Sequence, residues 1–214
     1  NPDLKVLVHI AHCLYCTYDT SRYPDSRVIR ANGKQAIWGV TTGYISQEKQ
    51  DAGWKFWIFY PTPGNSFHDV MMKSVDVLMD EIGIDGGFMD GFFAGYGGRW
   101  TYDGRWDGYS AEIDHQTKTI NRKIGSVLLL SQPSMIEYCR KIRNKGGAIV
   151  ANNTVVTRSL ANERYIIHDS ESGPGPQLHL APTITALALG HSDTQKSTYL
   201  NTLQNLQRGE LYII

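Results

Sequence analysis

The sequence predicts an α/β protein whose strands form a parallel sheet, and two observations lead to this class. Apolar, β-branched runs alternate along the chain with amphipathic segments that repeat at the period of a helix. The runs are also continuously apolar, as strands buried on both faces must be. The competing architecture is an open, doubly wound sheet, but no G-x-G-x-x-G turn follows the first run, which argues against a nucleotide-binding version of it. We predict a (β/α)8 barrel, as one catalytic domain over residues 1–214.

The strands of this barrel are expected where an apolar run ends at a turn residue or an acid. About seven runs qualify, so the first strand is expected either upstream of Asn1 or missing from a shortened barrel. The expected strands cover residues 4–13, 55–60, 87–93, 148–153, 164–169, 182–190 and 211–214.

Helices are expected between these runs. A helix that starts at Asn65 or Ser66 and ends before Gly83 has an apolar face at helical spacing and a residue type suited to each cap. Pro133 is expected to separate two further helices. These other helices are expected over residues 115–130, 134–144, 157–162 and 192–207. The stretches 14–53 and 94–114 are predicted as loops, and the first is too long for a passive connector.

The composition excludes several classes of partner. Lys and Arg together number 21, as do Asp and Glu, so no attraction to nucleic acid or to an anionic membrane is expected. No apolar run approaches the roughly 20 residues of a membrane-spanning helix. The three cysteines cannot all pair, which argues against a disulfide scaffold. The chain begins at Asn1-Pro2, so we expect a trimmed product, and we expect no cofactor.

Asp90 is the first candidate for chemistry. It lies near the carboxyl end of the run 87–93 and precedes a loop rich in Gly, Trp, Tyr and Asp. An ionised Asp is rarely buried without a partner, and the carboxyl ends of barrel strands are where catalytic groups lie. The competing interpretation is a structural carboxylate. We favour a catalytic one.

A second set of acids and amides follows at the ends of later strands. Asp169 ends the run 164–169 and Glu171 follows two residues later, and Asn152 and Asn153 end the run before it. Hydrolysis of a glycosidic bond needs two carboxyl groups on either side of the bond. Acids from two strands of one barrel can supply them, while the amides hydrogen-bond sugar hydroxyls. The alternative for the second pair is a loop cap and a solvated acid.

The loop after Asp90 supplies flat aromatic side chains next to polar ones. Pyranose rings have apolar C–H faces, so a sugar site combines aromatic rings with acids and amides, and glycines allow close approach. The competing interpretation is that one or two rings only pack the loop onto the barrel. The expected sugar-binding residues are Trp100, Trp106, Asp107, Tyr109, Asn152, Asn153 and His168.

Metal sites are the alternatives to this carbohydrate chemistry. A metal-dependent hydrolase would take its ligands from His9, His12, His168 and Asp90. A calcium site would use Asp103, Asp107 and Asp114, whose spacing matches no EF-hand loop. The pair Cys13 and Cys16 has no second pair of ligands nearby in the sequence, so packing is favoured over zinc.

The run Gly83-Ile-Asp-Gly-Gly-Phe-Met-Asp90-Gly resembles the fourth-strand region of the retaining α-galactosidase and α-glucosidase superfamily. The resemblance implies a barrel, with Asp90 as nucleophile and Glu171, or else Asp169, as acid/base. It makes the runs 4–13, 55–60, 87–93, 164–169 and 211–214 strands two, three, four, six and eight. Phe88 stands where many members carry Lys.

These observations together predict a glycoside hydrolase that cleaves an oligo- or polysaccharide, with carbohydrate as its partner. A secreted or periplasmic location is favoured for such an enzyme. A non-catalytic carbohydrate-binding barrel is the alternative from another functional class. The sugar, the linkage, the stereochemical outcome and the oligomeric state stay open.

Overall fold

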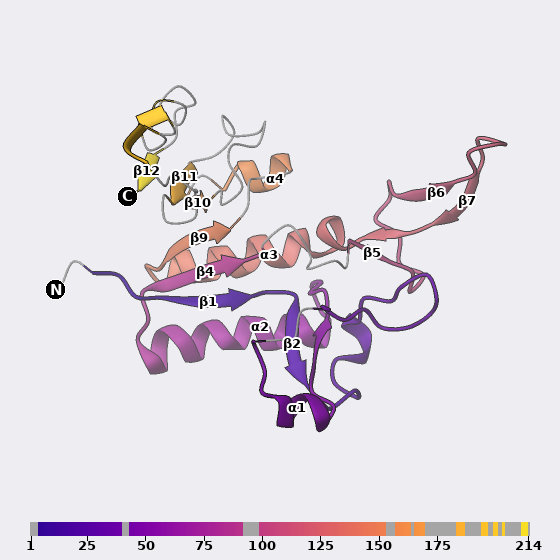
Figure 1. Cartoon of the computed structure of the whole chain (residues 1–214), viewed down its shortest axis with the longest axis horizontal. Coiled ribbons are helices and arrows are strands. Elements are labelled where there is room, and N and C mark those ends of the chain that lie inside the picture. Colours follow the sequence, from indigo (N-terminus) through magenta and orange to yellow (C-terminus); the bar gives the residue numbers. More distant parts are fainter. Residues whose placement is uncertain are drawn as a thin grey trace. The chain divides into compact units, whose positions relative to one another are not determined.

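The chain divides into two compact units, and Figure 1 labels its helices and strands. Unit 1 comprises Asn1–Ile10, Val75–Phe93 and Cys139–Ile214, and unit 2 comprises Ala11–Ser74 and Ala94–Tyr138. The computed structural model describes residues 4–39, 43–91, 99–152, 157–163, 165–169, 183–186, 194–196, 199–200, 203 and 211–213.

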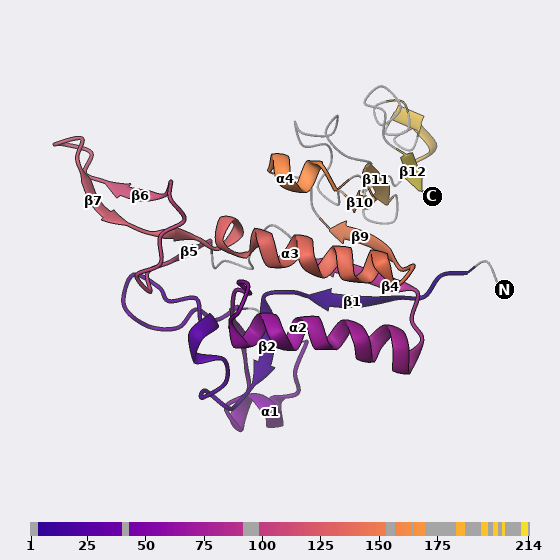
Figure 2. The same cartoon turned by 180° about the vertical axis from the view of Figure 1, so that it is seen from behind.

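A six-stranded sheet forms the centre of unit 1, and its strands lie side by side in the order in which they occur along the chain. The order is β1 (Leu7–Ala11), β4 (Gly86–Asp90), β9 (Ala148–Asn152), β10 (Ile166–Asp169), β11 (Thr183–Ala186) and β12 (Leu211–Ile213). Every pair from β4 to β12 is parallel, and β1 runs in the direction of β4 (Figures 1 and 2). This is the order of a singly wound sheet. Among the described residues no pairing joins β12 to β1, so closure into a barrel stays a prediction.

Apolar side chains pack closely against the middle of this sheet. Gly87 leaves room for Ile10 of β1 and Ile142, because a Cβ at this position would lie 3.2 and 3.6 Å from their terminal methyl groups. Met89 and Ile149 of the neighbouring strands are buried. Burial of each such side chain contributes about 1.5–3 kcal/mol, so the apolar runs explain why these strands form.

The helix expected over residues 66–82 is confirmed. It consists of α2 (Ser66–Asp76) and a π-helical turn, η2 (Val77–Ile82). Asn65 caps the start, because its side-chain oxygen accepts a hydrogen bond of 2.9 Å from the backbone N–H of His68. Gly83 ends the helix in the left-handed conformation, at a φ of 81°. No helix in the described ranges has the length and hydropathy required to span a membrane.

The prediction of two helices, over residues 115–130 and 134–144, is wrong. One helix, α3 (Val127–Asn144), contains Pro133, and the residues before it form strands. In the hairpin of β6 (Ala111–Ile113) and β7 (Ile120–Lys123), Glu112 pairs with Arg122 across the strands. The Arg122 Nη2 lies 2.9 Å from the Glu112 carboxylate. Cross-strand pairing of exposed polar residues therefore stabilises a segment that has no apolar period.

The prediction that residues 55–60 form the third strand of the barrel is also wrong, because this strand pairs in another sheet. β3 (Lys55–Ile58) pairs antiparallel with β2 (Leu14–Thr17) in a separate two-stranded sheet of unit 2. In unit 1 the strand next to β4 is β1, without an intervening strand. The expected loop 14–53 therefore contains β2, and also η1 (Pro24–Ser26) and α1 (Gln47–Asp51).

Unit 2 has its own small core. Its buried members are Val28, Ala36, Ile58, Tyr60 and Val127, with Leu14 and Leu130 packed against them. The stretch 94–114, expected to lack regular structure, contributes β5 (Trp100–Thr101), which pairs with β8 (Gly125–Ser126), as well as β6. The remaining short helix, α4 (Arg158–Ala161), belongs to unit 1 and begins after Thr157, as expected.

Candidate active site

Asp90 ends β4, and its carboxylate contacts side chains from the strands on both sides. The side-chain amide of Asn152, at the end of β9, donates a hydrogen bond of 2.8 Å to Asp90 Oδ1. On the other side, the Nε2 of His9 on β1 lies 3.3 Å from Asp90 Oδ2. The Asp90 side chain keeps 27% of its accessible surface. Two neighbours therefore orient the carboxylate while one part of it stays open to solvent.

His9 is held in place by more than the carboxylate. Its ring stacks on Phe88, with centroids 5.9 Å apart and an interplanar angle of 22°. The His9 side chain is 64% exposed, so solvent reaches the imidazole. When protonated, His9 forms an ion pair with Asp90, and when neutral it can still donate one hydrogen bond. The sequence suggested His9 only as a metal ligand and did not predict this contact.

The register of the sheet brings a second acid position into the same row. Asp169 of β10 is the backbone partner of Asn152, and Met89 of β4 is the partner of Ala151. Neighbouring strands lie about 4.8 Å apart, so the Cα atoms of Asp90 and Asp169 are separated by roughly 10 Å. The row His9, Asp90, Asn152 and Asp169 thus crosses four adjacent strands.

Several predicted residues lie outside the described side chains. Glu171 and Asn153 fall outside the described residues, and for His168 and Asp169 the structure describes only the backbone. The roles predicted for these four residues therefore stay predictions. Asn152 is the one predicted amide that the structure brings to Asp90.

The predicted sugar-binding aromatic residues belong to unit 2. Trp100, Trp106 and Tyr109 are 46%, 45% and 85% exposed, so they do not pack the loop into a core. The indole N–H of Trp106 donates a hydrogen bond of 2.9 Å to the carbonyl of Ser110. The Lys123 ammonium lies 4.0 Å from the centroid of the Trp106 ring. These contacts fix the orientation of Trp106 and cover part of its surface.

Asp107 closes a turn in unit 2. Its Oδ1 accepts hydrogen bonds from the backbone N–H of Tyr109 and Ser110, at 2.8 and 2.7 Å, and its Oδ2 accepts one of 2.5 Å from Ser126. Partial burial raises the pKa of this carboxyl, but these hydrogen bonds outweigh burial and hold the pKa below its ordinary value. The contacts give Asp107 a structural role, and its predicted role in sugar binding stays untested.

The acids proposed for calcium have separate partners. Asp103 accepts a hydrogen bond from the Tyr60 hydroxyl and lies 3.6 Å from the Arg105 Nε. Asp114 Oδ1 accepts hydrogen bonds from the backbone N–H groups of Gln116 and Thr117, at 2.7 and 2.9 Å. Asp103 and Asp114 thus each bind a different set of neighbouring groups.

Metal ligands are not grouped in the described part of the chain. No three His, Cys, Asp or Glu residues among those described lie close enough together to hold an ion. Cys13 and Cys16 are not joined in a disulfide, and burial raises the pKa of Cys16 against the opposing charge of Lys49. The hydrolase alternative also includes His168, whose side chain is not among those described, so that alternative stays a prediction.

Comparison with known proteins gives no relative from which a role could be transferred. No family model matches the chain, and no significant match is found among curated proteins or solved structures. The arrangement of side chains is therefore the basis for a functional proposal.

Proposed function

We propose that this chain is a glycoside hydrolase in which Asp90 is the catalytic nucleophile. The contact that carries the proposal is the carboxylate of Asp90 held between the Asn152 amide and the His9 imidazole at the end of β4. An oriented and partly exposed carboxylate meets the geometric requirement for attack on, or charge stabilisation at, an anomeric carbon.

The second carboxyl group in this proposal is Glu171, with Asp169 as its substitute. Asp169 is the last residue of β10 and Glu171 comes two residues later in the sequence, and the Cα of Asp169 lies two strands from that of Asp90. Where one carboxylate is the nucleophile, the two carboxyl groups lie about 5–5.5 Å apart, and side chains from residues two strands apart can reach such a separation. Within unit 2, the exposed rings of Trp100, Trp106 and Tyr109 offer surfaces that suit the apolar faces of sugars.

The test is the release of reducing ends from a panel of polysaccharides by wild-type protein and by Asp90→Asn. We expect the wild type to hydrolyse at least one polysaccharide and Asp90→Asn to lose at least about a thousandfold of that rate, as removal of a nucleophile does. Glu81→Gln is the matched control. It removes an exposed carboxylate from the same unit, and its rate should equal that of the wild type.

Three outcomes would reject the proposal. Wild-type activity in Asp90→Asn would exclude Asp90 as nucleophile. Binding of a polysaccharide without any turnover by the wild type would identify a carbohydrate-binding protein. Activity that a strong chelator abolishes would instead favour the metal-dependent hydrolase.

A further inference from the structure

The two faces of the sheet in unit 1 differ in burial. Side chains alternate across each strand, and the backbone register aligns every second residue of β4, β9 and β10 on the same face. One face is closely packed, and its members are at most 1% exposed: Met89, Ile149, Ala151 and Ile166. The other face carries Asp90, and its apolar members are only partly buried: Phe88, Val150 and Ile167. The face with the proposed nucleophile is therefore partly accessible from solvent.

On this accessible face a row of apolar side chains borders a row of polar residues. Phe88 is the backbone partner of Val150, which is in turn the partner of Ile167. The next row, towards the carboxyl ends of the strands, contains Asp90, Asn152 and Asp169, the last placed by its backbone. An apolar surface next to acids and an amide suits a sugar ring, which combines apolar C–H faces with hydroxyls at its edge.

His9 connects the two rows at the β1 side of the sheet. Its ring stacks on Phe88, with centroids 5.9 Å apart and an interplanar angle of 22°, and its Nε2 lies 3.3 Å from Asp90 Oδ2. The His9 side chain is 64% exposed, so Phe88 supports one part of the ring while the rest faces solvent. A planar ring supported in this way loses little conformational entropy when a sugar stacks on it.

The charges on this face favour a neutral sugar. Asp90 and Asp169 are acids, and His9 is the only base among the described residues of the two rows. His9 already pairs with Asp90. A carboxylate or sulfate on the sugar would therefore meet two acids without a separate cation to bind it, and like charges brought together oppose binding.

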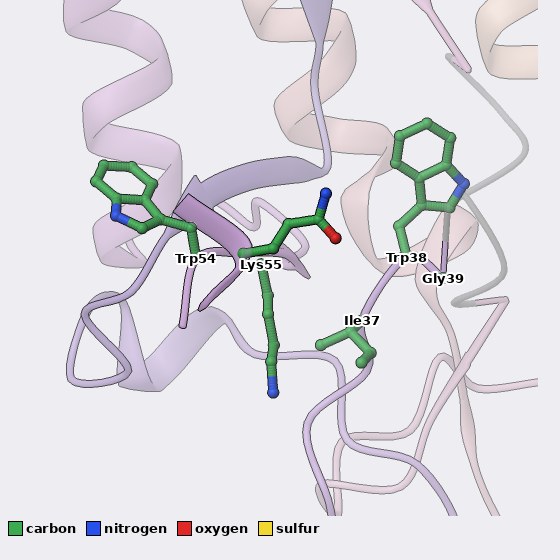
Figure 3. A pocket seen from close by; sticks show the side chains of 6 residues that line it. Ile37, Trp38, Gly39, Trp54 and Lys55 are labelled. Atoms are coloured by element: carbon green, nitrogen blue, oxygen red, sulfur yellow. The ribbon is translucent and has the colours of Figure 1, made fainter. Parts of the chain in front are cut away.

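A pocket of about 220 Å³ in unit 2 does not offer a comparable surface. Figure 3 shows that the indoles of Trp38 and Trp54 point away from each other. The side-chain amide of Gln50 donates a hydrogen bond of 3.0 Å to a backbone carbonyl, and the Lys55 ammonium lies 5.8 Å from the centroid of the Trp57 ring. The polar groups at this pocket are thus engaged by the protein itself.

We propose that the sugar unit attacked by Asp90 is a neutral pyranose whose apolar C–H face packs against the imidazole of His9. This inference rests on the proposed hydrolase function, because it identifies the class of substrate for that site. His9 then has two effects, which different substitutions separate. Its ring binds the sugar, whereas its Nε2 orients the Asp90 carboxylate.

The first test compares the binding of the whole chain to neutral and to acidic polysaccharides. Native electrophoresis in gels that contain dextran, pullulan or galactan, or else polygalacturonate or alginate, gives the affinity from the retardation. At least one neutral polysaccharide should retard the wild type, and neither uronate polymer should. The proposal is overturned if none of the five retards the protein, or if a uronate polymer retards it as strongly as the best neutral one.

His9→Ala and His9→Phe separate the two effects of the imidazole. His9→Ala should weaken retardation by the neutral polysaccharide about fivefold to tenfold, the size of effect expected for one aromatic contact. His9→Phe keeps a ring on Phe88, so its retardation should stay within about twofold of the wild type, while its kcat falls because Nε2 is lost. Equal losses of binding in the two variants would mean that the ring does not bind the sugar.

Tyr199→Ala is the matched control, because it removes a ring that is 63% exposed and belongs to the same unit. It should be retarded as the wild type is. An equal loss in Tyr199→Ala and His9→Ala would indicate general adhesion of exposed rings and would overturn the proposal.

Binding and turnover together distinguish a failure of this proposal from a failure of the proposed function. If the wild type binds a neutral polysaccharide, His9→Ala loses that binding and neither protein hydrolyses it, only the catalytic role is rejected. Hydrolysis with a KM that His9→Ala leaves unchanged would reject only the contact between the sugar and the imidazole.

Discussion

At the scale of single residues, the most informative contact is between side chains far apart in sequence. Asn152 follows Asp90 by 62 residues, yet its amide binds the carboxylate. The sequence predicted both residues, because each ends an apolar run at the carboxyl end of a strand. It did not predict His9 as a partner, since the pairing of β1 with β4 depends on which segments enter the sheet.

Asn152→Ala should lower kcat of the hydrolysis by about tenfold to a hundredfold, with a smaller effect on KM. One hydrogen bond to a charged group contributes roughly 1.5–3 kcal/mol, and its loss leaves the Asp90 carboxylate less well oriented. Steady-state kinetics on the polysaccharide that the wild type hydrolyses provide the measurement. Asn162→Ala, which changes an exposed amide of the same unit, is the control. Unchanged kinetics in Asn152→Ala would mean that this amide does not position Asp90.

A second residue-scale prediction concerns Tyr60, which is buried and donates its hydroxyl hydrogen bond to Asp103. Burial first, and then Asp103, raises the pKa of Tyr60 above its ordinary value. Above about pH 10 the unfolded state therefore loses a proton that the folded state keeps, so the free energy of unfolding falls as pH rises.

Tyr60→Phe should remove this part of the alkaline destabilisation. At pH 7 the variant should be about 1 kcal/mol less stable than the wild type, because one hydrogen bond is lost. Between pH 9 and pH 11 its stability should fall less steeply. Urea denaturation followed by tryptophan fluorescence at each pH gives both quantities. Identical slopes for the two proteins would show that Tyr60 does not contribute.

At the scale of elements, continuous apolar runs predicted strands well but did not predict their partners. The run 148–153 is β9, as expected, whereas 55–60 includes a strand that pairs antiparallel in another sheet. Apolar character reports burial, and burial is common to both sheets. The hairpin of β6 and β7 was missed for the opposite reason. Its stability depends on polar contacts, such as the Tyr102 hydroxyl bond of 2.9 Å to Glu112.

The start of β4 yields an element-scale prediction. Gly86 has a φ of 152°, and a Cβ there would lie 2.0 Å from the carbonyl oxygen of Ala148 on β9. Gly86→Ala should therefore separate the two strands and destabilise unit 1 by about 3 kcal/mol or more. Hydrogen exchange followed by mass spectrometry should show lost protection in the peptides that contain β4 and β9.

Gly83→Ala is the matched control for this experiment. Gly83 also has a positive φ, 81°, but a Cβ at this position would have no neighbouring atom within 4 Å. The variant should lose only about 1 kcal/mol, the cost of the left-handed conformation, and should retain protection in β4. Equal effects of the two substitutions would mean that the contact with Ala148 does not limit the packing of β4.

At the scale of the whole molecule, the two units can be observed separately. All five tryptophans, Trp38, Trp54, Trp57, Trp100 and Trp106, belong to unit 2. Tryptophan fluorescence therefore reports on unit 2, whereas β4 and β9 belong to unit 1. The sequence alone did not predict this division, because each unit is assembled from stretches that are interrupted by the other.

Gly86→Ala should consequently change the two units to different extents. We expect the tryptophan-detected urea midpoint to stay close to that of the wild type, while exchange protection in β4 and β9 is lost. The physical reason is that the substitution disturbs a contact within unit 1. A fluorescence midpoint that falls together with the loss of protection would show that the units unfold as one cooperative structure.

The measurement that tests the central proposal most directly is chemical rescue of Asp90→Ala by azide or formate. If Asp90 is the nucleophile, the variant should be almost inactive, and a small anion in the space left by the carboxylate should restore turnover. With azide, the product should be a glycosyl azide. Hydrolysis by Asp90→Ala at the wild-type rate, without dependence on added anion, would contradict the assignment of Asp90.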